Sequence, residues 1–78
     1  MKITTIKLPS EKVTEDIWEW LFNNCGKGVV DDNNAWANPE ITWAMWTSFV
    51  LNDRKMIEYW FFEFKNYPDA ALFRMRWE

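Results

Sequence analysis

The sequence contains no histidine and only one cysteine, and each scarcity excludes a class of chemistry. Without histidine, the chain lacks the commonest general base and cannot form the Ser-His or Cys-His pairs of nucleophilic enzymes. A single cysteine without histidine cannot supply the ligands of a zinc site, and it excludes an internal disulfide. Cys25 lies at the end of a predicted helix, so no helix N-terminus activates its thiol. The sequence therefore predicts a protein that is not an enzyme, with no cofactor and no evident small-molecule substrate.

Long apolar runs are also absent. No segment approaches the roughly 18 apolar residues of a membrane span, and the N-terminus lacks the cationic and apolar pattern of a secretory signal. Together with the unpaired cysteine, this predicts a cytoplasmic protein without a membrane partner. The formal net charge is −3. Nucleic-acid binding is disfavoured by this balance, because a basic stripe that neutralises phosphates supplies most of that affinity.

Aromatic residues, in contrast, are abundant. They make up 19% of the 78 residues, with seven Trp, six Phe and two Tyr. A chain of this length forms one domain, residues 1–78, whose small core limits its stability. Large rings each bury about 150–250 Å², so one interpretation is a dense core built from rings. The other is that surplus rings mark a binding or self-association face.

The first half of the chain predicts a strand, a helix and an irregular connection. Residues 2–8 are rich in β-branched side chains and end at Pro9, which favours a strand. A helix is expected over 14–25, because Thr14 is a good N-cap, apolar residues recur at helical spacing and Gly26 follows as a stop. Residues 26–40 show no regular pattern, and Trp36 is expected to attach them to the body of the domain.

The second half begins with a predicted β-hairpin, whose strands span 41–51 and 56–65 around a turn at 52–55. Pairing Leu51 with Met56 fixes the register and divides the side chains between two faces. We expect one face to be the core: Trp43, Met45, Thr47, Phe49 and Leu51 with Met56, Glu58, Trp60, Phe62 and Phe64. The other face is mixed: Thr42, Ala44, Trp46, Ser48 and Val50 with Ile57, Tyr59, Phe61, Glu63 and Lys65.

The chain end predicts a short helix and a short last strand. Residues 66–69 are a helix-start signature with Pro68 near the first helical position, and residues 70–73 form one or two turns. Residues 74–78 alternate like a strand with Met75 and Trp77 inward. The predicted fold is α+β, a ferredoxin-like β-α-β-β-α-β arrangement with an antiparallel sheet and both helices on one face.

The closing run of residues 62–77 carries a distinctive pattern, Phe62-x-Phe64-x-Asn66-x-x-Asp69-Ala70-x-Leu72-Phe73-x-x-Arg76-Trp77. It resembles a run found in small, uncharacterised bacteriophage proteins. The resemblance implies a viral origin, with the host cytoplasm as the location, and it implies no activity.

Three short motifs suggest chemistry but lack its required pattern. Residues 26–28 (Gly-Lys-Gly) end a helix, whereas a phosphate-binding Walker loop precedes one. Residues 31–34 with Glu40 offer oxygen ligands without the spacing and central glycine of an EF-hand, so a solvated turn and weak Ca²⁺ or Mg²⁺ binding stay open. Glu58 and Glu63 point to opposite faces of their strand, which excludes a catalytic carboxylate pair.

The mixed face of the hairpin is the candidate functional site. With both helices on the other side, this face is bare unless a partner covers it, and exposed Trp and Tyr side chains are typical of binding hot spots. The sequence therefore favours a protein-interaction module, self-associating as a homodimer or binding a partner protein. The candidate partner-binding residues are Trp46, Tyr59, Phe61, Val50 and Ile57. The alternative is single-stranded nucleic-acid binding by base stacking on the same face, with phosphate contacts from Lys65, Arg74 and Arg76.

Overall fold

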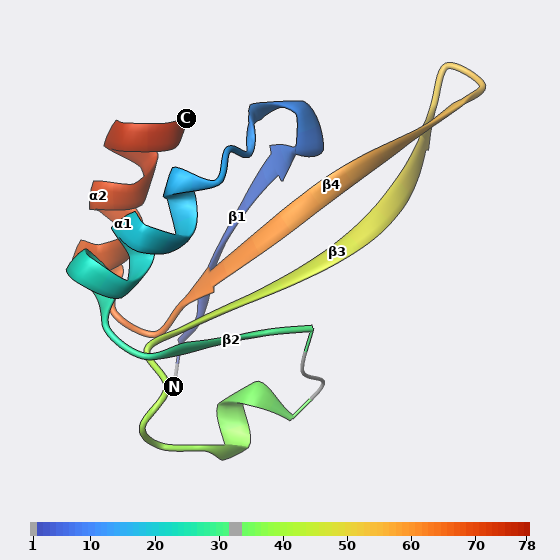
Figure 1. Cartoon of the computed structure of the whole chain (residues 1–78). Helices are drawn as coiled ribbons and strands as arrows, with labels where there is room; N and C mark the ends of the chain where they lie inside the picture. Colours follow the sequence, from blue (N-terminus) through green and yellow to red (C-terminus); the bar gives the residue numbers. More distant parts are fainter. Residues whose placement is uncertain (1, 32–33) are drawn as a thin grey trace.

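The computed structural model describes residues 2–31 and 34–78, which form a four-stranded sheet with two α-helices against it (Figure 1). None of the helices in these residues is long and apolar enough to cross a membrane. The elements, in chain order, are β1 (Thr4–Pro9), η1 (Ser10–Lys12), α1 (Asp16–Cys25), β2 (Gly28–Val30), η2 (Ala35–Ala37), β3 (Trp43–Asn52), β4 (Lys55–Phe64) and α2 (Tyr67–Trp77), where η denotes a short 3₁₀ helix.

The sheet is mixed, with the strand order β1-β4-β3-β2. β4 pairs antiparallel with β3, as the predicted hairpin requires, and also with β1, but β2 runs parallel to β3. The prediction of an antiparallel sheet in a β-α-β-β-α-β order is therefore wrong, although the α+β class is confirmed. The fourth strand comes from residues 28–30, inside the segment that was predicted to be irregular. Three residues are too short for a periodic signal, so their pairing is decided by tertiary contacts.

The predicted last strand is helical. α2 extends to Trp77, and Met75, which was expected to point inward, is 84% exposed. The reason lies in spacing: Ala70, Phe73 and Trp77 stand three and four residues apart, which places them on one face of a helix. Ala70 and Phe73 are buried and Trp77 is partly buried. Those contacts outweigh the two-residue alternation of Met75 and Trp77.

The β3–β4 hairpin has the predicted register. Leu51 lies opposite Met56, and the pairing continues to Trp43 opposite Phe64. The strands extend one residue further into the turn than expected, so that Asp53 and Arg54 alone connect them. Both residues have positive φ, 49° and 67°, as a two-residue type I′ turn requires.

Both helices cover the same face of the sheet, which carries the core (Figure 1). Trp18 of α1 contacts the rings of Trp43, Trp60 and Phe62 at centroid distances of 5.6–6.3 Å. Phe73 of α2 contacts Phe62 at 4.7 Å. The fully buried large side chains are Trp43, Phe62, Phe64, Phe73, Ile6, Leu8, Ile17, Leu21 and Ile41. The structure thus confirms the core positions of Phe62 and Phe64, whereas Trp60 is only partly buried.

The end of the hairpin projects beyond the helices as an arm, residues 49–58 (Figure 1). Ten-residue strands span about 33 Å, whereas the ten residues of α1 span only about 15 Å. The helices therefore cannot cover the whole face. Phe49, Leu51 and Met56 were predicted to be core, and that prediction is wrong: they are 60%, 67% and 61% exposed.

A close contact between Gly28 and Trp43 fixes β2 against the sheet. A Cβ atom at Gly28 would lie 2.1 Å from two ring atoms of Trp43, so only glycine leaves room for the buried indole. The Trp43 indole Nε1 donates a hydrogen bond to the Gly26 carbonyl, 2.9 Å away, and Gly26 ends α1 with φ of 84°. Residues 26–28 thus connect the end of α1 to β2. They follow a helix, whereas a phosphate-binding loop precedes one.

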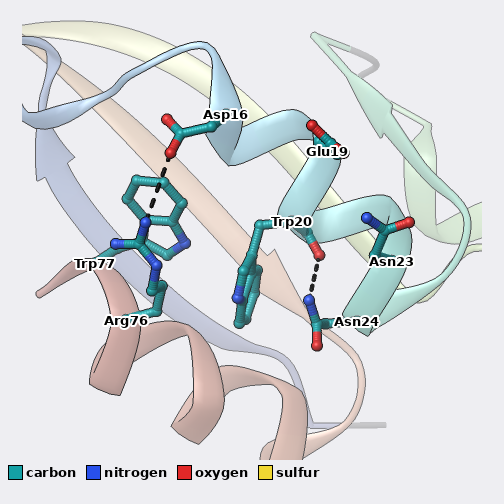
Figure 2. Close-up of a pocket in the computed structure, with 7 residues that line it drawn as sticks. All are labelled: Asp16, Glu19, Trp20, Asn23, Asn24, Arg76 and Trp77. Atoms are coloured by element: carbon teal, nitrogen blue, oxygen red, sulfur yellow. Dashed lines mark hydrogen bonds and ion pairs between the residues drawn. The ribbon is translucent and has the colours of Figure 1, made fainter.

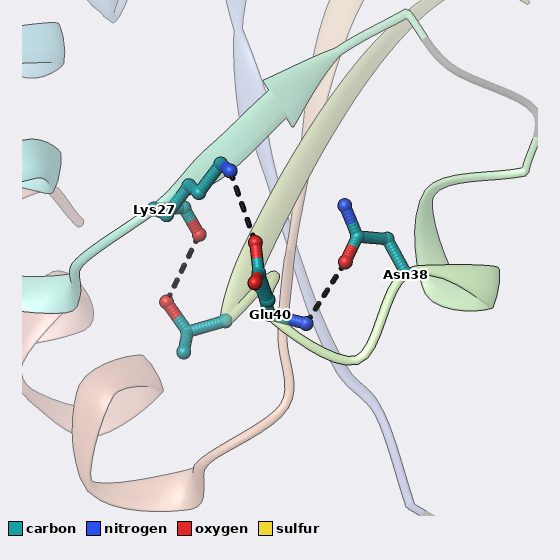
Figure 3. Close-up of polar contacts among 4 residues, drawn as sticks. Lys27, Asn38 and Glu40 are labelled. Carbon is teal, nitrogen blue, oxygen red and sulfur yellow. Dashed lines mark hydrogen bonds and ion pairs between the residues drawn. The ribbon is translucent and has the colours of Figure 1, made fainter.

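Polar contacts close the connection between β2 and β3 at its base (Figure 3). The Lys27 Nζ lies 3.2 Å from a carboxylate oxygen of Glu40, and the Glu40 amide donates to the Asn38 side-chain oxygen at 3.0 Å. The Thr42 hydroxyl donates to the Cys25 carbonyl. Glu40, which had been considered as a cation ligand, instead forms an exposed ion pair.

Candidate interaction surface

The five candidate partner-binding residues lie together on the sheet face that the helices leave open. They share parity in the register: Trp46 is opposite Phe61, Val50 is opposite Ile57, and Tyr59 lies between those pairs on β4. We call this set the aromatic face. Trp46 is 40% and Val50 38% exposed, and the other three are partly buried. The sequence therefore predicted the grouping of these side chains correctly.

The centre of the aromatic face is a stacked ring pair. The centroids of Trp46 and Phe61 are 4.0 Å apart, and their planes differ by 7°. Such a pair contributes about 0.5–1.5 kcal/mol beyond the area it buries, and it holds both rings in fixed orientations. A partner therefore meets a preformed flat surface, whose ordering costs little conformational entropy on binding.

A cation flanks the aromatic face on β1. The Lys7 Nζ lies 4.5 Å from the centroid of the Tyr59 ring, a distance at which an ammonium is attracted to the ring face. Lys7 pairs in register with Phe61 and so shares its side of the sheet. The apolar centre thus has a polar margin, which is the usual anatomy of a protein interface.

The connection between β2 and β3 covers the other end of the open face. The Trp36 indole on η2 donates to a carboxylate oxygen of Glu63 at 3.4 Å, and the Lys65 ammonium donates to the Pro39 carbonyl at 3.4 Å. Ala44, on the same face, is only 4% exposed. The expected attachment of this connection by Trp36 is confirmed, and it leaves the aromatic face uncovered.

Sequence reasoning missed the apolar side chains of the arm that face the helix side of the sheet. Phe49, Leu51 and Met56 have the parity of core residues, which is why the pattern placed them inside. Strand length was the signal that could have identified them, because ten-residue strands outreach helices of ten and eleven residues. Apolar side chains are consequently exposed on both faces of the arm.

The free thiol of Cys25 is buried. Burial, with a smaller contribution from Asp69, raises the pKa of the Cys25 thiol to about 12, so it stays protonated at neutral pH. No cluster of three or more candidate metal ligands occurs in residues 2–31 and 34–78. Asp32 and Asn33 of the proposed oxygen-ligand turn lie outside the described residues.

Two shallow hollows accompany the helices. The first, about 240 Å³, lies between α1 and α2 (Figure 2), where Arg76 approaches Asp16 at 3.6 Å and stands over the Trp77 ring at 4.2 Å. Its lining residues are Asp16, Glu19, Trp20, Asn23, Asn24, Arg76 and Trp77. The buried Trp77 Nε1 has no hydrogen-bond partner among the described residues. The lining carries two carboxylates, Asp16 and Glu19, and one guanidinium, Arg76.

The second hollow, about 540 Å³, is basic and lies where β1 begins. Its lining residues are Lys2, Ile3, Thr4, Lys65, Tyr67 and Arg74. The Arg74 Nε lies 3.8 Å from a carboxylate oxygen of Glu78, and Arg76 pairs with Asp16 of α1. Of the three cations considered as phosphate ligands, Lys65 and Arg74 line this hollow and Arg76 lines the first, so neither hollow that they line includes Trp46 or Phe61.

No protein-family model, no curated protein and no solved structure matches the chain.

Proposed function

We propose that this chain is a non-enzymatic protein-interaction module whose contact surface is the aromatic face, and that a second copy of the chain is its first partner. The observation that carries the proposal is the Trp46–Phe61 stack, 40% exposed at Trp46, on a sheet face that neither helix covers. Val50 and Ile57 extend this apolar surface onto the arm. Contiguous apolar surface of this kind marks interaction sites in proteins.

The chemistry of the face supports a protein partner. Trp and Tyr are enriched among the residues that contribute most to binding, and they act best at the centre of a patch surrounded by polar groups. Trp46 and Tyr59 hold such central positions, with Lys7 and Glu63 at the margin. Two-fold self-association is the commonest way in which soluble proteins cover such a patch. The bacteriophage-like closing run extends the proposal to a viral protein that acts in the host cytoplasm, on itself, a host protein or a virion component.

Single-stranded nucleic acid is the second candidate for the same face. Lys7 beside the Tyr59 ring provides one cation next to a stacking platform. The net charge of −3 and the placement of Lys65, Arg74 and Arg76 away from the Trp46–Phe61 stack favour a protein partner.

Phe61→Glu tests the proposal, because it places a charge at the centre of the aromatic face. Phe61 is outside the core, so the variant should keep its circular dichroism spectrum while the sedimentation mass of the assembly falls. Met75→Glu is the matched control: it adds the same charge at a side chain that is 84% exposed on α2, and it should assemble like the wild type. Ile57→Glu, which removes no ring contact, should reproduce the effect of Phe61→Glu.

A salt titration separates the two candidates. Association through apolar rings should change little with ionic strength, whereas affinity for an oligothymidylate should fall steeply as salt rises. If Phe61→Glu assembles like the wild type, the aromatic face is not the self-association surface. Salt-sensitive oligothymidylate binding that Phe61→Glu abolishes would favour the nucleic-acid candidate instead.

A further inference from the structure

A second surface, distinct from the aromatic face, lies along the outer side of β3. β2 pairs only with residues 43–45 of β3, and within the described part of the chain no strand lies beside residues 46–52. We call this stretch the free β3 edge. The Asp31 amide donates to the Met45 carbonyl at 2.7 Å, so Met45 directs its backbone outward. Because alternate residues of a strand direct their backbone groups to the same side, Thr47, Phe49 and Leu51 do so as well.

β1 and the free β3 edge differ in how well they are protected from pairing with another chain. Edge strands usually carry charges or proline that prevent pairing with other chains. β1, at one edge, has Lys7 within it and Pro9 at its end. β3 contains neither a charge nor a proline from Trp43 to Asn52, and it combines high β-propensity with large apolar side chains. An edge of this composition is suited to pairing with another strand.

We infer that a second copy of the chain pairs its own β3 antiparallel with this free edge, about a two-fold axis at Phe49. The position of the axis follows from the limits of the edge, since Met45 already bonds β2 and Asp53 begins the turn. Phe49 is midway between them, so only this register uses the whole edge without a collision between the turn and β2. The sheets of the two copies then continue into one another.

This arrangement covers the apolar side chains that the helices leave bare. On the helix side of the sheet, Phe49 faces Phe49 of the second copy, and Leu51 faces Thr47. Directly opposed residues of an antiparallel pair have Cα atoms about 4.5–5.5 Å apart, close enough for their side chains to pack. Phe49 and Leu51 are 60% and 67% exposed in the single chain, so the pairing removes apolar surface of both side chains from water.

Charge complementarity supports the same register. With Phe49 on the axis, the turn of one copy lies beside the end of β2 in the other. The turn and its flank carry Asp53, Arg54 and Lys55, with a net positive charge, and the exposed Asp31 follows the last residue of β2. An attraction between Arg54 or Lys55 and Asp31 of the second copy therefore favours the antiparallel, full-length register over shifted ones.

Leu51→Pro tests the edge directly, because proline removes an outward N–H and leaves the β3–β4 hydrogen bonds in place. Leu51→Ala, which keeps that N–H, is the matched control. We expect Leu51→Pro to raise the dissociation constant of the edge contact at least about tenfold, and Leu51→Ala to have a smaller effect. In the wild type, the amides of Thr47, Phe49 and Leu51 should become protected from hydrogen exchange as protein concentration rises.

Two lysine variants give a second test that does not depend on proline. Phe49→Lys places two like charges opposite each other at the axis, and Met56→Lys places the same charge on the other strand of the arm, at a side chain of similar exposure. The first should dissociate the edge contact and the second should not. Equal assembly of Phe49→Lys and Met56→Lys, or exchange of the outward amides that is independent of concentration, would overturn the inference.

Leu51→Pro and Phe61→Glu distinguish the edge contact from the contact through the aromatic face. If Leu51→Pro lowers the assembly mass and Phe61→Glu does not, the edge contact stands and the aromatic-face proposal is wrong. The opposite pattern refutes the edge contact alone. If both variants lower the mass, two different two-fold contacts operate and the wild type forms assemblies larger than a dimer. A wild type that is monomeric at high micromolar concentration overturns the edge inference.

Discussion

Substitution of Gly28 by alanine tests how the sheet is assembled around Trp43. The added Cβ atom would lie 2.1 Å from Cδ2 and Cε2 of the indole and 2.6 Å from its Nε1, well inside van der Waals contact. The ring is 1% exposed, so it cannot move aside without disturbing the core. Displacing it also strains the 2.9 Å hydrogen bond from Nε1 to the Gly26 carbonyl.

The magnitude follows from these two terms. Overpacking a core typically costs about 1–3 kcal/mol, and a lost hydrogen bond adds about 1 kcal/mol, which gives about 2–4 kcal/mol. A domain of 78 residues has a total stability of about 4–12 kcal/mol. Gly28→Ala should therefore lower the free energy of unfolding by at least about a sixth, and by half or more if the stability lies at the low end of that range; urea denaturation followed by tryptophan fluorescence can measure the loss.

Gly26→Ala provides the comparison. Gly26 has a φ of 84° and a ψ of −147°, close to a region that is nearly exclusive to glycine and where a side chain costs about 1–3 kcal/mol, but an added Cβ there is 3.2 Å from its nearest neighbour outside the adjoining residues, Thr42 Oγ1. The structure predicts that Gly28→Ala lowers the free energy of unfolding more than Gly26→Ala does. If these glycines served only to end the helix, Gly26→Ala would have the larger effect. If Gly28→Ala denatures at the urea concentration of the wild type, the packing described for β2 and Trp43 is wrong.

Two further predictions concern stability. Phe62→Ala should lower the free energy of unfolding by about 3–5 kcal/mol, because Phe62 is 0% exposed. Met56→Ala, on the same face of β4 but 61% exposed, should lower it by no more than about 1 kcal/mol. Equal losses of stability in urea denaturation would contradict the arm that projects beyond the helices. The pKa of the Cys25 thiol, raised from 9.0 to about 12 by burial, predicts a stability that is full below pH 9 and falls as pH rises toward 12, because the unfolded chain then loses the proton first. Cys25→Ala should remove that part of the decline in pH-dependent denaturation, with a slope of at most about 1.4 kcal/mol per pH unit.

The hairpin was the part of the fold that sequence predicted best. Its alternation over ten residues on each strand specifies both faces, since a slip by one residue would exchange them. The register then brought Trp46, Val50, Ile57, Tyr59 and Phe61 together without any knowledge of the rest of the fold. The helix predicted over residues 14–25 is also present, because its apolar spacing and the stop at Gly26 agree with the structure. It begins two residues later than expected, at Asp16, and its N-cap is Glu15 and not Thr14.

The failures have a common physical origin in tertiary context. β2 has three residues, and its pairing depends on the fit of Gly28 against Trp43, which local pattern does not show. The helical end of α2 is decided by burial of Phe73 against Phe62 and Phe64. The pattern likewise assigned Phe49 to the core because parity identifies a face and does not show how far the helices extend along it.

The mass of the wild-type protein in solution shows whether the chain self-associates through the aromatic face. Sedimentation equilibrium from low to high micromolar concentration measures it without labels or variants. Self-association through the aromatic face predicts that the mass rises with concentration from the 9.5 kDa of one chain toward a whole multiple of that value, and that the rise is nearly the same at low and high salt. A mass that stays at 9.5 kDa up to high micromolar concentration would contradict the claim.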